Sequence, residues 1–389
     1  MASGNGSLDG ILVADFSHVL SGPYATMTLG DLGADIVRIE HPGGGDQTRG
    51  WGPPFYDGES AYFLAVNRNK RSAQIDLKDP AGIDVARRLL ERADVVVQNF
   101  RPGVMEDVGL GYEDVVAINP RIIYCSISAF GTTDLGSQMP GYDLLVQAMS
   151  GLMSITGTSD GQPVKVGVAV ADVIAGLNVT VGVLAALHRR NVTGVGQRVD
   201  VDLFSSMLAA LVNQASTFLT GGGVPRAMGM KHPSIVPYEL FPTATRSIII
   251  AVGTDRQFRS LVDVLGLPEM AADDRFATNE TRVRHRVQLI DRLGAAFLPR
   301  DADEVVGELT AAGVPCGPIN TIAEAFDLAA KLGLDPVVDI PRPDGIAVPQ
   351  VASPIRMSES PPTYRSPPPR LGADTAEILD RFGYEQRET

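Results

Sequence analysis

The sequence contains few of the residues on which metal-centred and disulfide-linked folds depend. Only two cysteines occur in 389 residues, Cys125 and Cys316, and both have apolar neighbours. There is no CxxC and no Cys/His pairing, so neither a zinc site nor a disulfide framework is expected. So little cysteine is typical of a reducing compartment. We therefore expect a cytoplasmic protein that binds no metal.

Positive charge and long hydrophobic runs are also scarce. Lys and Arg number 33 against 46 Asp and Glu, which gives a formal net charge of −13. Nucleic acids and anionic membranes both require a positive surface, so neither is expected as a partner, whereas an anionic small molecule needs only a few local cations. Residues 1–7 have no signal-peptide core, and the apolar run at 177–187 is too short and too interrupted to span a membrane.

Several catalytic motifs are missing as well. The sequence has no G-x-x-x-x-G-K-[ST], no H-E-x-x-H and no G-x-S-x-G, which removes the usual sequence support for P-loop, zinc-protease and α/β-hydrolase chemistry. Residues 11–40 read as strand, turn, helix and strand, as in a dinucleotide-binding unit. The turn at 18–23 carries a single glycine, however, so the backbone cannot approach a pyrophosphate in the usual way and no NAD is expected.

What is present indicates an α/β protein. The composition, 44% apolar and 20% charged, is that of a globular protein, and the length favours two domains. Strands and helices alternate, which predicts an open, Rossmann-like parallel sheet whose ligand lies at the carboxyl ends of the strands. Strands are expected at 11–16, 35–40, 73–77, 94–98, 121–128 and 197–203, and helices at 23–32, 80–93, 141–153, 176–190 and 204–219.

A second, smaller α+β domain is expected beyond the glycine-rich residues 220–225. It has a strand at 247–252 and helices near 255–265, 282–298, 302–312 and 322–332. The proline-rich segment 336–369 is not expected to fold alone. The chain closes with a helix at about 373–382.

Asp172 is the most unusual carboxylate in the sequence. It follows the apolar residues 164–171, which read as a buried strand or crossing segment, and it precedes the apolar helix expected at 176–190. A carboxylate in such a setting is costly to ionise unless something uses or satisfies it. Taken alone, the stretch favours the structural interpretation that Asp172 is the N-cap of the helix.

The order and spacing of many short motifs resemble the class III CoA-transferases, the CaiB/BaiF family. The resemblance covers nearly the whole chain. Its matching stretches are 15–23, 32–40, 48–51, 69–72, 99–103, 141–143, 171–172, 193–197 and 368–375.

The resemblance implies a large CoA-binding domain formed by residues 1–220 and 335–389, and a small domain formed by 225–333. It places linkers near 220–237 and 334–350, and it implies a homodimer of two interlocked chains. It also makes Asp172 the nucleophile that receives CoA, and no metal or redox cofactor is needed. The CoA-binding positions that it suggests are His18, Val19, Leu20, Ser21, His41, Ile75, Lys78, Asn99, Phe100, Arg101, Met139, Pro140, Gly141 and Tyr142.

The sequence departs from the family pattern at three positions. His41, Asp107 and Pro140 stand where some relatives carry a cation that meets the CoA phosphates. Candidates to supply that charge instead are Arg38, Lys70, Arg101 and Arg49.

Several of these positions keep a structural alternative. His18 can be a polar turn residue and Asn99 can satisfy the backbone of its turn. Lys70 can be a solvated surface charge, and Tyr142 can be a packed aromatic residue with a wet hydroxyl.

We therefore expect an acyl-CoA:carboxylate CoA-transferase that works through an aspartyl anhydride and an aspartyl-CoA thioester, with backbone N–H groups stabilising the oxyanions. The first alternative is an acyl-CoA racemase. Racemases of this family place a His in a Gly-His-Asp turn, which here reads Gly141-Tyr142-Asp143, and Tyr is poorly matched to proton exchange at neutral pH. The second alternative is a CoA-binding protein without catalysis. Oxalate is disfavoured as a substrate, because residues 231–237 lack the glycine run of oxalate-type relatives.

Overall fold

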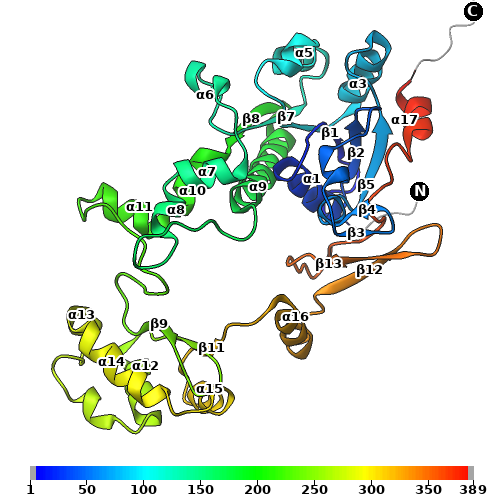
Figure 1. Ribbon diagram of the computed structural model, residues 1–389. Helices are drawn as coiled ribbons and strands as arrows, with labels where there is room; N and C mark the ends of the chain where they lie inside the picture. Colours follow the sequence, from blue (N-terminus) through cyan, green and yellow to red (C-terminus); the bar gives the residue numbers. More distant parts are fainter. Residues whose placement is uncertain (1–5, 384–389) are drawn as a thin grey trace, which may run out of the picture. The chain divides into compact units, whose positions relative to one another are not determined.

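The computed structural model describes residues 6–383, and the chain divides into two compact units (Figure 1). The larger comprises Met1–Leu152, Lys165–Val224 and Asp335–Thr389, and the smaller comprises Met153–Val164 and Pro225–Leu334. This division differs from the expected boundaries mainly at 153–164, which join the smaller unit. Backbone bonds account for the difference, because the amides of Ala227 and Gly229 donate to the carbonyls of Ser154 and Gly157.

A six-stranded parallel sheet forms the centre of the larger unit. Its order is β5-β2-β1-β6-β7-β8, so the first strand of the chain lies near the middle of the sheet and later strands are added on both sides of it. The order reverses between β1 and β6, and ligands of such sheets bind outside the carboxyl ends at that point. The strands are β1 (Leu12–Asp15), β2 (Asp35–Glu40), β5 (Lys70–Gln74), β6 (Val95–Gln98), β7 (Ile123–Ser128) and β8 (Gln197–Asp202).

The α/β class and the parallel sheet agree with the sequence, but the third strand does not. It was expected at 73–77 and lies at Lys70–Gln74, where Ile36 of β2 pairs with Lys70. The sequence pattern disfavours a lysine in a buried strand. Lys70 is accommodated because its Nζ lies 3.1 Å from the carboxylate of Asp15.

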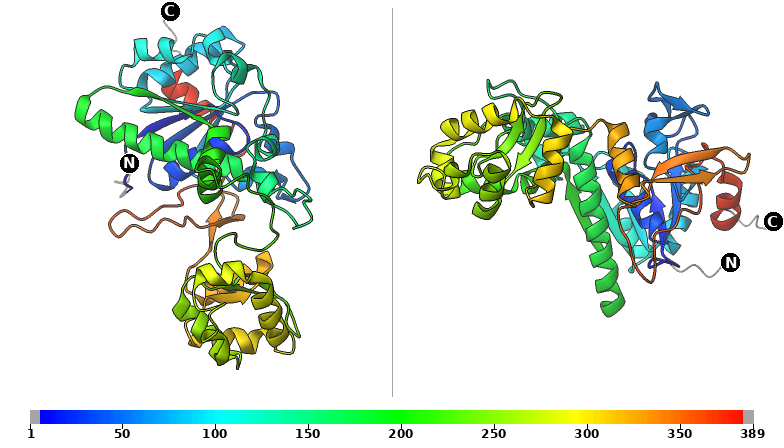
Figure 2. Two further views of the ribbon diagram at one scale, coloured as in Figure 1. Left: turned by 90° about the vertical axis from the view of Figure 1, so that its left-hand side faces the viewer. Right: turned by 90° about the horizontal axis from the view of Figure 1, so that it is seen from below.

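Helices cover both faces of this sheet (Figures 1 and 2). One face packs against α1 (Ser21–Asp31) and the long helix α9 (Val170–Thr193), with Leu29, Val179 and Val183 in its core. The other packs against α3 (Pro80–Arg92), α5 (Tyr112–Ile118) and α17 (Thr375–Phe382). The sheet is therefore apolar on both sides, as parallel sheets usually are.

Helix α9 corrects two expectations about Asp172. The helix begins at Val170, well before residue 176, and its N-cap is Ala169, which forms no side-chain cap. Asp172 thus lies inside the first turn, and the N-cap interpretation was wrong. The preceding residues were expected to be buried, but Val164 is 48% exposed and Val168 is 63% exposed. By length and composition α9 is the one described helix that could cross a membrane, yet its inner face is part of the core of the larger unit.

The remaining elements of the larger unit are mostly short. The helix expected at 204–219 is divided at Val212, whose φ of 44° interrupts it. The proline-rich segment contains a hairpin that the sequence did not predict. The elements are η1 (Gln47–Gly50), β3 (Phe55–Tyr56), β4 (Glu59–Ser60), α2 (Ala61–Leu64), α4 (Val104–Asp107), α6 (Asp134–Gln138), α7 (Asp143–Met149), α10 (Leu203–Ala210), α11 (Val212–Leu219), β12 (Val337–Pro341) and β13 (Ala347–Val351).

The smaller unit has an antiparallel sheet of order β11-β10-β9 and its own apolar core. The helix expected at 282–298 begins earlier and is divided at His285. Its elements are β9 (Tyr238–Phe241), β10 (Ile248–Ala251), β11 (Cys316–Pro318), α12 (Asp255–Val264), η2 (Pro268–Ala271), α13 (Asn279–Arg284), α14 (Arg286–Phe297), α15 (Ala302–Ala311) and α16 (Ile322–Lys331). Residues of α8 (Leu152–Ile155) lie at the boundary of the two units.

Candidate active site

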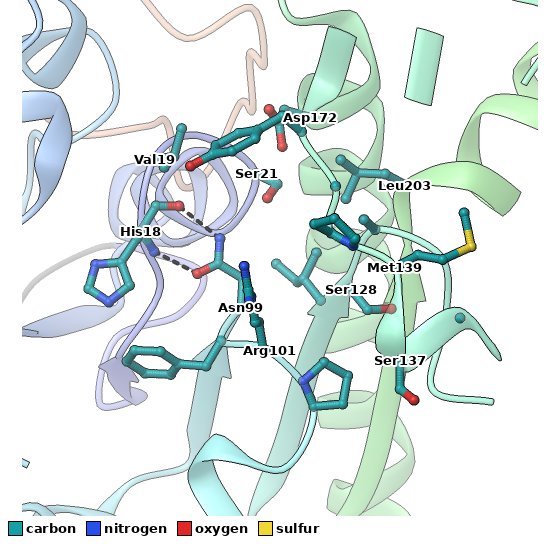
Figure 3. Close-up of a pocket in the computed structure, with 18 of the residues that line it drawn as sticks. His18, Val19, Ser21, Asn99, Arg101, Ser128, Ser137, Met139, Asp172 and Leu203 are labelled. Atoms are coloured by element: carbon teal, nitrogen blue, oxygen red, sulfur yellow. Dashed lines mark hydrogen bonds between the residues drawn. The ribbon is translucent and has the colours of Figure 1, made fainter. Parts of the chain in front are cut away.

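A pocket of about 250 Å³ opens at the carboxyl ends of the central strands of the larger unit (Figure 3). It is bounded by the turns after β1, β6 and β7 and by the first turn of α9, so it lies where the sheet order reverses. Many of the predicted site residues meet there. The predicted residues that line it are Asp172, His18, Val19, Ser21, Asn99, Phe100, Arg101, Met139, Pro140, Gly141 and Tyr142.

The turn after β1 is fixed by hydrogen bonds between its backbone and the side chains of Asn99 and Asp46. The Oδ1 atom of Asn99 accepts from the backbone N–H of His18 at 2.7 Å, and its Nδ2 donates to the carbonyl of His18 at 2.8 Å (Figure 3). Val19 has a φ of 67°, unusual for a β-branched residue, and its N–H donates to Asp46 at 3.0 Å. Asn99 thus satisfies the hydrogen-bonding groups of the turn backbone, which was its structural interpretation from the sequence. It also lines the pocket.

Helices α1 and α9 approach closely at the pocket. A Cβ atom on Gly176 would lie 2.6 Å from the carbonyl oxygen of Ser21, so only glycine fits at this crossing. Gly176 follows Asp172 by about one turn. The close approach places Ser21 near Asp172, and both side chains line the pocket (Figure 3).

Asp172 is the only acid among the described residues that line the pocket. Burial and the neighbouring charge of Asp143 raise its pKa to about 6, while the hydrogen bond from Ser21 opposes the shift. Burial also raises the pKa of Tyr62 to about 12, with the charges of Asp172 and Asp143 adding to the effect. Near neutral pH the site therefore holds an ionised but destabilised carboxylate beside a protonated phenol.

Asp143 occupies the backbone donors that begin α9. Its Oδ1 atom accepts from the N–H of Ala171 at 2.7 Å and from that of Asp172 at 3.3 Å. These donors were natural candidates for an oxyanion hole, because helix N-termini present free N–H groups. Since Asp143 already uses them, the donors for an oxyanion must come from elsewhere in the pocket.

Serine chemistry has less support. Ser21, Ser128 and Ser137 line the pocket, but within the described chain no hydrogen bond joins any of them to a histidine. The ring of His18 packs instead edge-on against Phe100, with the centroids 5.0 Å apart. A serine without a base is a weak nucleophile.

Two predicted phosphate contacts need correction. The side chains of Arg38 and Lys70 are fully buried, where Arg38 pairs with Asp15 and Asp46 and Lys70 pairs with Asp15. Neither side chain can reach a bound phosphate without breaking these ion pairs. The alternative interpretation of Lys70 as a solvated surface charge is also wrong, because its side chain is fully buried. Both therefore leave the set of CoA-binding candidates.

Arg49 is also engaged, because its Nη2 lies 2.7 Å from the carboxylate of Glu40. Arg101, by contrast, is exposed and lines the pocket. It is therefore the cation best placed to meet a phosphate.

Four further predicted residues do not line this pocket. Leu20 is half-buried behind it and Ile75 is buried in the core. His41 and Lys78 are exposed near Asp76, which accepts the backbone N–H of Lys78. Their contacts with CoA stay predictions. Tyr142 is 63% exposed at the pocket and so is not the packed aromatic residue of its structural alternative.

The pocket also includes residues that the sequence did not single out. Ser128 ends β7, and the rule that ligands meet the carboxyl ends of parallel strands could have identified it. Gln47, Ile127 and Leu203 carry no comparable signal. Tyr62 does not line the pocket, but the charges of Asp172 and Asp143 act on its phenol, and no signal in the sequence indicates that either. Among the described residues, no group of three His, Cys, Asp or Glu side chains is placed to hold a metal ion.

The comparisons with known proteins agree with this arrangement. A sequence profile of "CoA-transferase family III" matches residues 8–375. The chain is 43% identical to a succinate--glutarate CoA-transferase of Agrobacterium fabrum, over 96% of this chain and 94% of that protein, and 42% identical to the mouse succinyl-CoA:glutarate CoA-transferase, over 96% and 85%. A crystal structure of a CaiB/BaiF family protein from Brucella suis superposes with a TM-score of 0.85 at 41% identity, covering 97% of this chain and 100% of that one. The chain therefore belongs to CoA-transferase family III, the CaiB/BaiF family, and is an acyl-CoA:carboxylate CoA-transferase.

Proposed function

We propose that this enzyme transfers CoA through covalent intermediates on Asp172. The observation that carries the proposal is the position of this carboxylate, which is the one acid among the described lining residues of the pocket. Its pKa of about 6 leaves it ionised at neutral pH, and burial weakens its solvation. A desolvated, ionised carboxylate is a suitable nucleophile toward a thioester.

The reaction would proceed in balanced steps. Asp172 attacks the carbonyl carbon of the acyl-CoA, and the CoA thiolate leaves, which forms a mixed anhydride. The thiolate then attacks the aspartyl carbonyl, so the donor acid departs with one oxygen from Asp172 and an aspartyl-CoA thioester remains. The acceptor carboxylate reverses these steps and leaves with CoA. Each oxyanion requires nearby donors, and water must be excluded because it would hydrolyse the anhydride.

The other lining residues have supporting roles in this proposal. The hydroxyl of Ser21 orients the Asp172 carboxylate, and Asn99 fixes the turn that carries Ser21. The exposed guanidinium of Arg101 meets a CoA phosphate. No metal or nicotinamide takes part, which stays a prediction from the sequence, as does the cytoplasmic location.

We further propose succinyl-CoA as donor and a short dicarboxylic acid such as glutarate as acceptor. The support comes from the relatives. The Agrobacterium, mouse and human proteins at 41–43% identity are named for succinate or succinyl-CoA and glutarate. Two haloarchaeal relatives at 37% and 35% identity are named for succinyl-CoA and mesaconate. Succinyl-CoA therefore recurs as the donor while the acceptor varies.

We also propose that the enzyme is a homodimer of interlocked chains. The larger unit exposes large apolar side chains on α9, where Val181 is 66% exposed, and on α11, where Phe218 is 59% and Leu219 is 79% exposed. Apolar surface of this kind usually marks an interface. Light scattering coupled to size-exclusion chromatography should give twice the chain mass of 41.3 kDa, and a monomer at micromolar concentration would overturn the dimer.

The proposal is tested by incubating the enzyme with a panel of acyl-CoA donors and carboxylic acids and identifying new acyl-CoA species by mass spectrometry. Succinyl-CoA with glutarate should yield glutaryl-CoA, and Asp172→Ala should abolish it while the variant stays folded. Wild-type rates in that variant would show that Asp172 is not the nucleophile. Exchange of the α-proton with deuterium in the absence of an acid would instead support racemase activity.

A further inference from the structure

The first turn of α9 is held by a carboxylate from a different helix. Asp143, the first residue of α7, accepts from the backbone N–H of Ala171 at 2.7 Å and from that of Asp172 at 3.3 Å. Its second oxygen accepts from Nε2 of Gln147 at 2.6 Å. The Gln147 amide in turn donates to the carbonyl of Val168 and accepts from the N–H of Val166. Asp143 and Gln147 together therefore fix the first turn of α9, which carries Asp172, and the segment 166–168 that precedes it.

We infer that Asp143 is a positioning residue whose negative charge also drives Asp172 toward its covalent forms. An ionised carboxylate only accepts hydrogen bonds, and all three groups that face Asp143 here are N–H donors. Two of them lie at the positive end of α9, which stabilises a negative charge. The hydrogen bonds around Asp143 therefore suit a carboxylate, which lies beside that of Asp172. This inference rests on the assignment of Asp172 as the nucleophile.

The repulsion between the two carboxylates depends on the reaction stage. It is present when Asp172 is a free carboxylate, because like charges at short range disfavour each other. It disappears when Asp172 is an anhydride or a thioester, since neither form carries a charge. The pair therefore raises the free energy of the resting enzyme relative to both covalent intermediates. Such a change favours acylation of Asp172, provided that the position of its backbone is preserved.

The other groups that face Asp172 do not cancel this repulsion. Tyr62 lies close enough for both carboxylates to affect it, but burial keeps its phenol neutral. Ser21 donates a hydrogen bond without carrying charge. Within residues 6–383, no Lys or Arg is among the causes that shift the pKa of Asp172. Asp143 is thus the charged neighbour on which the behaviour of Asp172 depends.

The competing interpretation is that Asp143 merely caps a helix. Two substitutions separate the interpretations. Asp143→Asn keeps an acceptor oxygen for the two N–H groups and removes the charge. Asp143→Glu keeps the charge and changes the reach. Asp301→Asn is the matched control, because Asp301 caps α15 in the smaller unit by accepting from two backbone N–H groups, at 2.9 and 3.2 Å.

The experiment measures the pH profile of kcat/KM and, by intact-protein mass spectrometry, the steady-state fraction of CoA-bound enzyme. In Asp143→Asn the acid limb should move from about pH 6 toward lower pH, and the covalent fraction should fall about three- to tenfold, the size expected for a like charge a few ångströms away in a partly solvated site. Asp143→Glu should keep the acid limb near pH 6 but lower kcat. Asp301→Asn should match the wild type in both readouts.

Two outcomes have different meanings. An unchanged acid limb and an unchanged covalent fraction in a folded Asp143→Asn would overturn the inference and leave Asp143 as a cap. If Asp143→Asn is unstable, an acid limb in Asp143→Glu that moves to lower pH, although the charge is kept, would overturn it as well. Absence of any CoA adduct on the wild-type enzyme would instead refute the assignment of Asp172, whichever result the Asp143 variants gave.

Discussion

The larger unit contains two groups of carboxylates that differ in the cations around them. In the first group, Asp15, Glu40 and Asp46 surround Arg38. Lys70 also pairs with Asp15, and Arg49 also pairs with Glu40. In the second, Asp143 and Asp172 lie together with no cation among the groups that set the pKa of Asp172. The first group is fully buried and the second is half-buried. Burial alone would raise the pKa values of both groups, so the presence or absence of cations determines the direction in which each group departs from its ordinary values.

The pKa values of the first group are lowered, whereas the pKa of Asp172 in the second group is raised. Although burial opposes ionisation, the hydrogen bond from Arg49 and the charges of Arg38 and Arg49 lower the pKa of Glu40 to about 2. The pKa values of Asp15 and Asp46 are also lowered, against burial, by their cations and hydrogen bonds. Burial and Asp143 raise that of Asp172 to about 6. The first group is thus stabilised in its ionised form by its cations, and the second contains the carboxylate that we propose as the nucleophile.

Removing the central cation should have the largest effect on stability. Arg38→Met would remove the one cation in the described chain that contacts all three buried carboxylates and the only one there paired with Asp46, and breaking a buried ion pair in this way costs about 3–5 kcal/mol of unfolding free energy. Urea unfolding followed by circular dichroism measures it. The matched control is Arg246→Met, which removes exposed ion pairs to Asp303 and Glu324 and should cost less than about 1 kcal/mol. Equal losses in both variants would show that the network adds no stability beyond surface pairs.

The crossing of α1 and α9 connects the two groups, and a larger residue should disturb it. In Gly176→Ala the new Cβ would lie 2.6 Å from the backbone oxygen of Ser21, so the helices must separate. We expect a loss of about 1–3 kcal/mol in stability and a fall in kcat. Gly294→Ala in α14 is the control, because its Cβ has open space and should stabilise the helix slightly. An active, fully stable Gly176→Ala would contradict the close approach.

Neutralising Asp172 should stabilise the protein at neutral pH. The folded pKa of Asp172, about 6, lies above its unfolded value near 3.8, so ionisation destabilises the folded state above pH 6. Stability from this group is present below about pH 4 and is lost as the pH rises through 6. Asp172→Asn should therefore gain about 1–2 kcal/mol at pH 7, after allowance for partial exposure, and the gain should vanish near pH 4. A variant that is less stable than wild type at pH 7 would refute this.

The acidic network should show the opposite pH dependence. The folded pKa of Glu40, about 2, is below its unfolded value near 4.5, so its stabilisation is present above pH 4.5 and is lost as the pH falls toward 2. Thermal unfolding of the wild type should therefore show a melting temperature that drops below pH 4.5. Arg38→Met should show a weaker drop, because less stabilisation remains to be lost.

The smallest expected effect concerns the turn after β1. Asn99→Ala removes both hydrogen bonds to the backbone of His18 and should raise the KM for acyl-CoA several-fold, which corresponds to about 1 kcal/mol. Asn119→Ala is the control, because the Asn119 side chain also makes two hydrogen bonds to the backbone, donating to the carbonyls of Leu90 and Ala93, but does not line the pocket. It should lower stability and leave KM unchanged. A similar KM change in both variants would argue against a specific role for the turn.

Much of the fold was accessible from the sequence because it depends on local pattern. The apolar runs that became β1, β2, β6 and β7 and the glycine and proline turns between them predicted a parallel sheet with its ligand at the carboxyl ends. The predictions failed where a tertiary contact overrides the pattern. β5 begins at Lys70 because Asp15 neutralises it inside the protein. α9 begins at Val170 because a carboxylate from α7 satisfies its first turn.

The residues of the site also divide into those that local pattern could predict and those that depend on tertiary contacts. Asp172, His18, Asn99 and Arg101 follow strands or begin a helix, so their convergence at one edge follows from topology. Arg38 and Lys70 were assigned to CoA because the sequence does not show which carboxylates face them across the sheet. Tyr62 and Asp143 were missed as neighbours of Asp172 for the same reason, since each reaches it from a distant segment.

The covalent role of Asp172 is tested most directly by finding CoA on that residue. The wild-type enzyme should be mixed with succinyl-CoA, quenched within milliseconds in acid, digested and sequenced by tandem mass spectrometry. We expect a CoA thioester on the peptide that contains Asp172, and this adduct should be lost when glutarate is added before the quench. Transfer that proceeds without this adduct, or with CoA attached to another residue, would contradict the covalent role of Asp172.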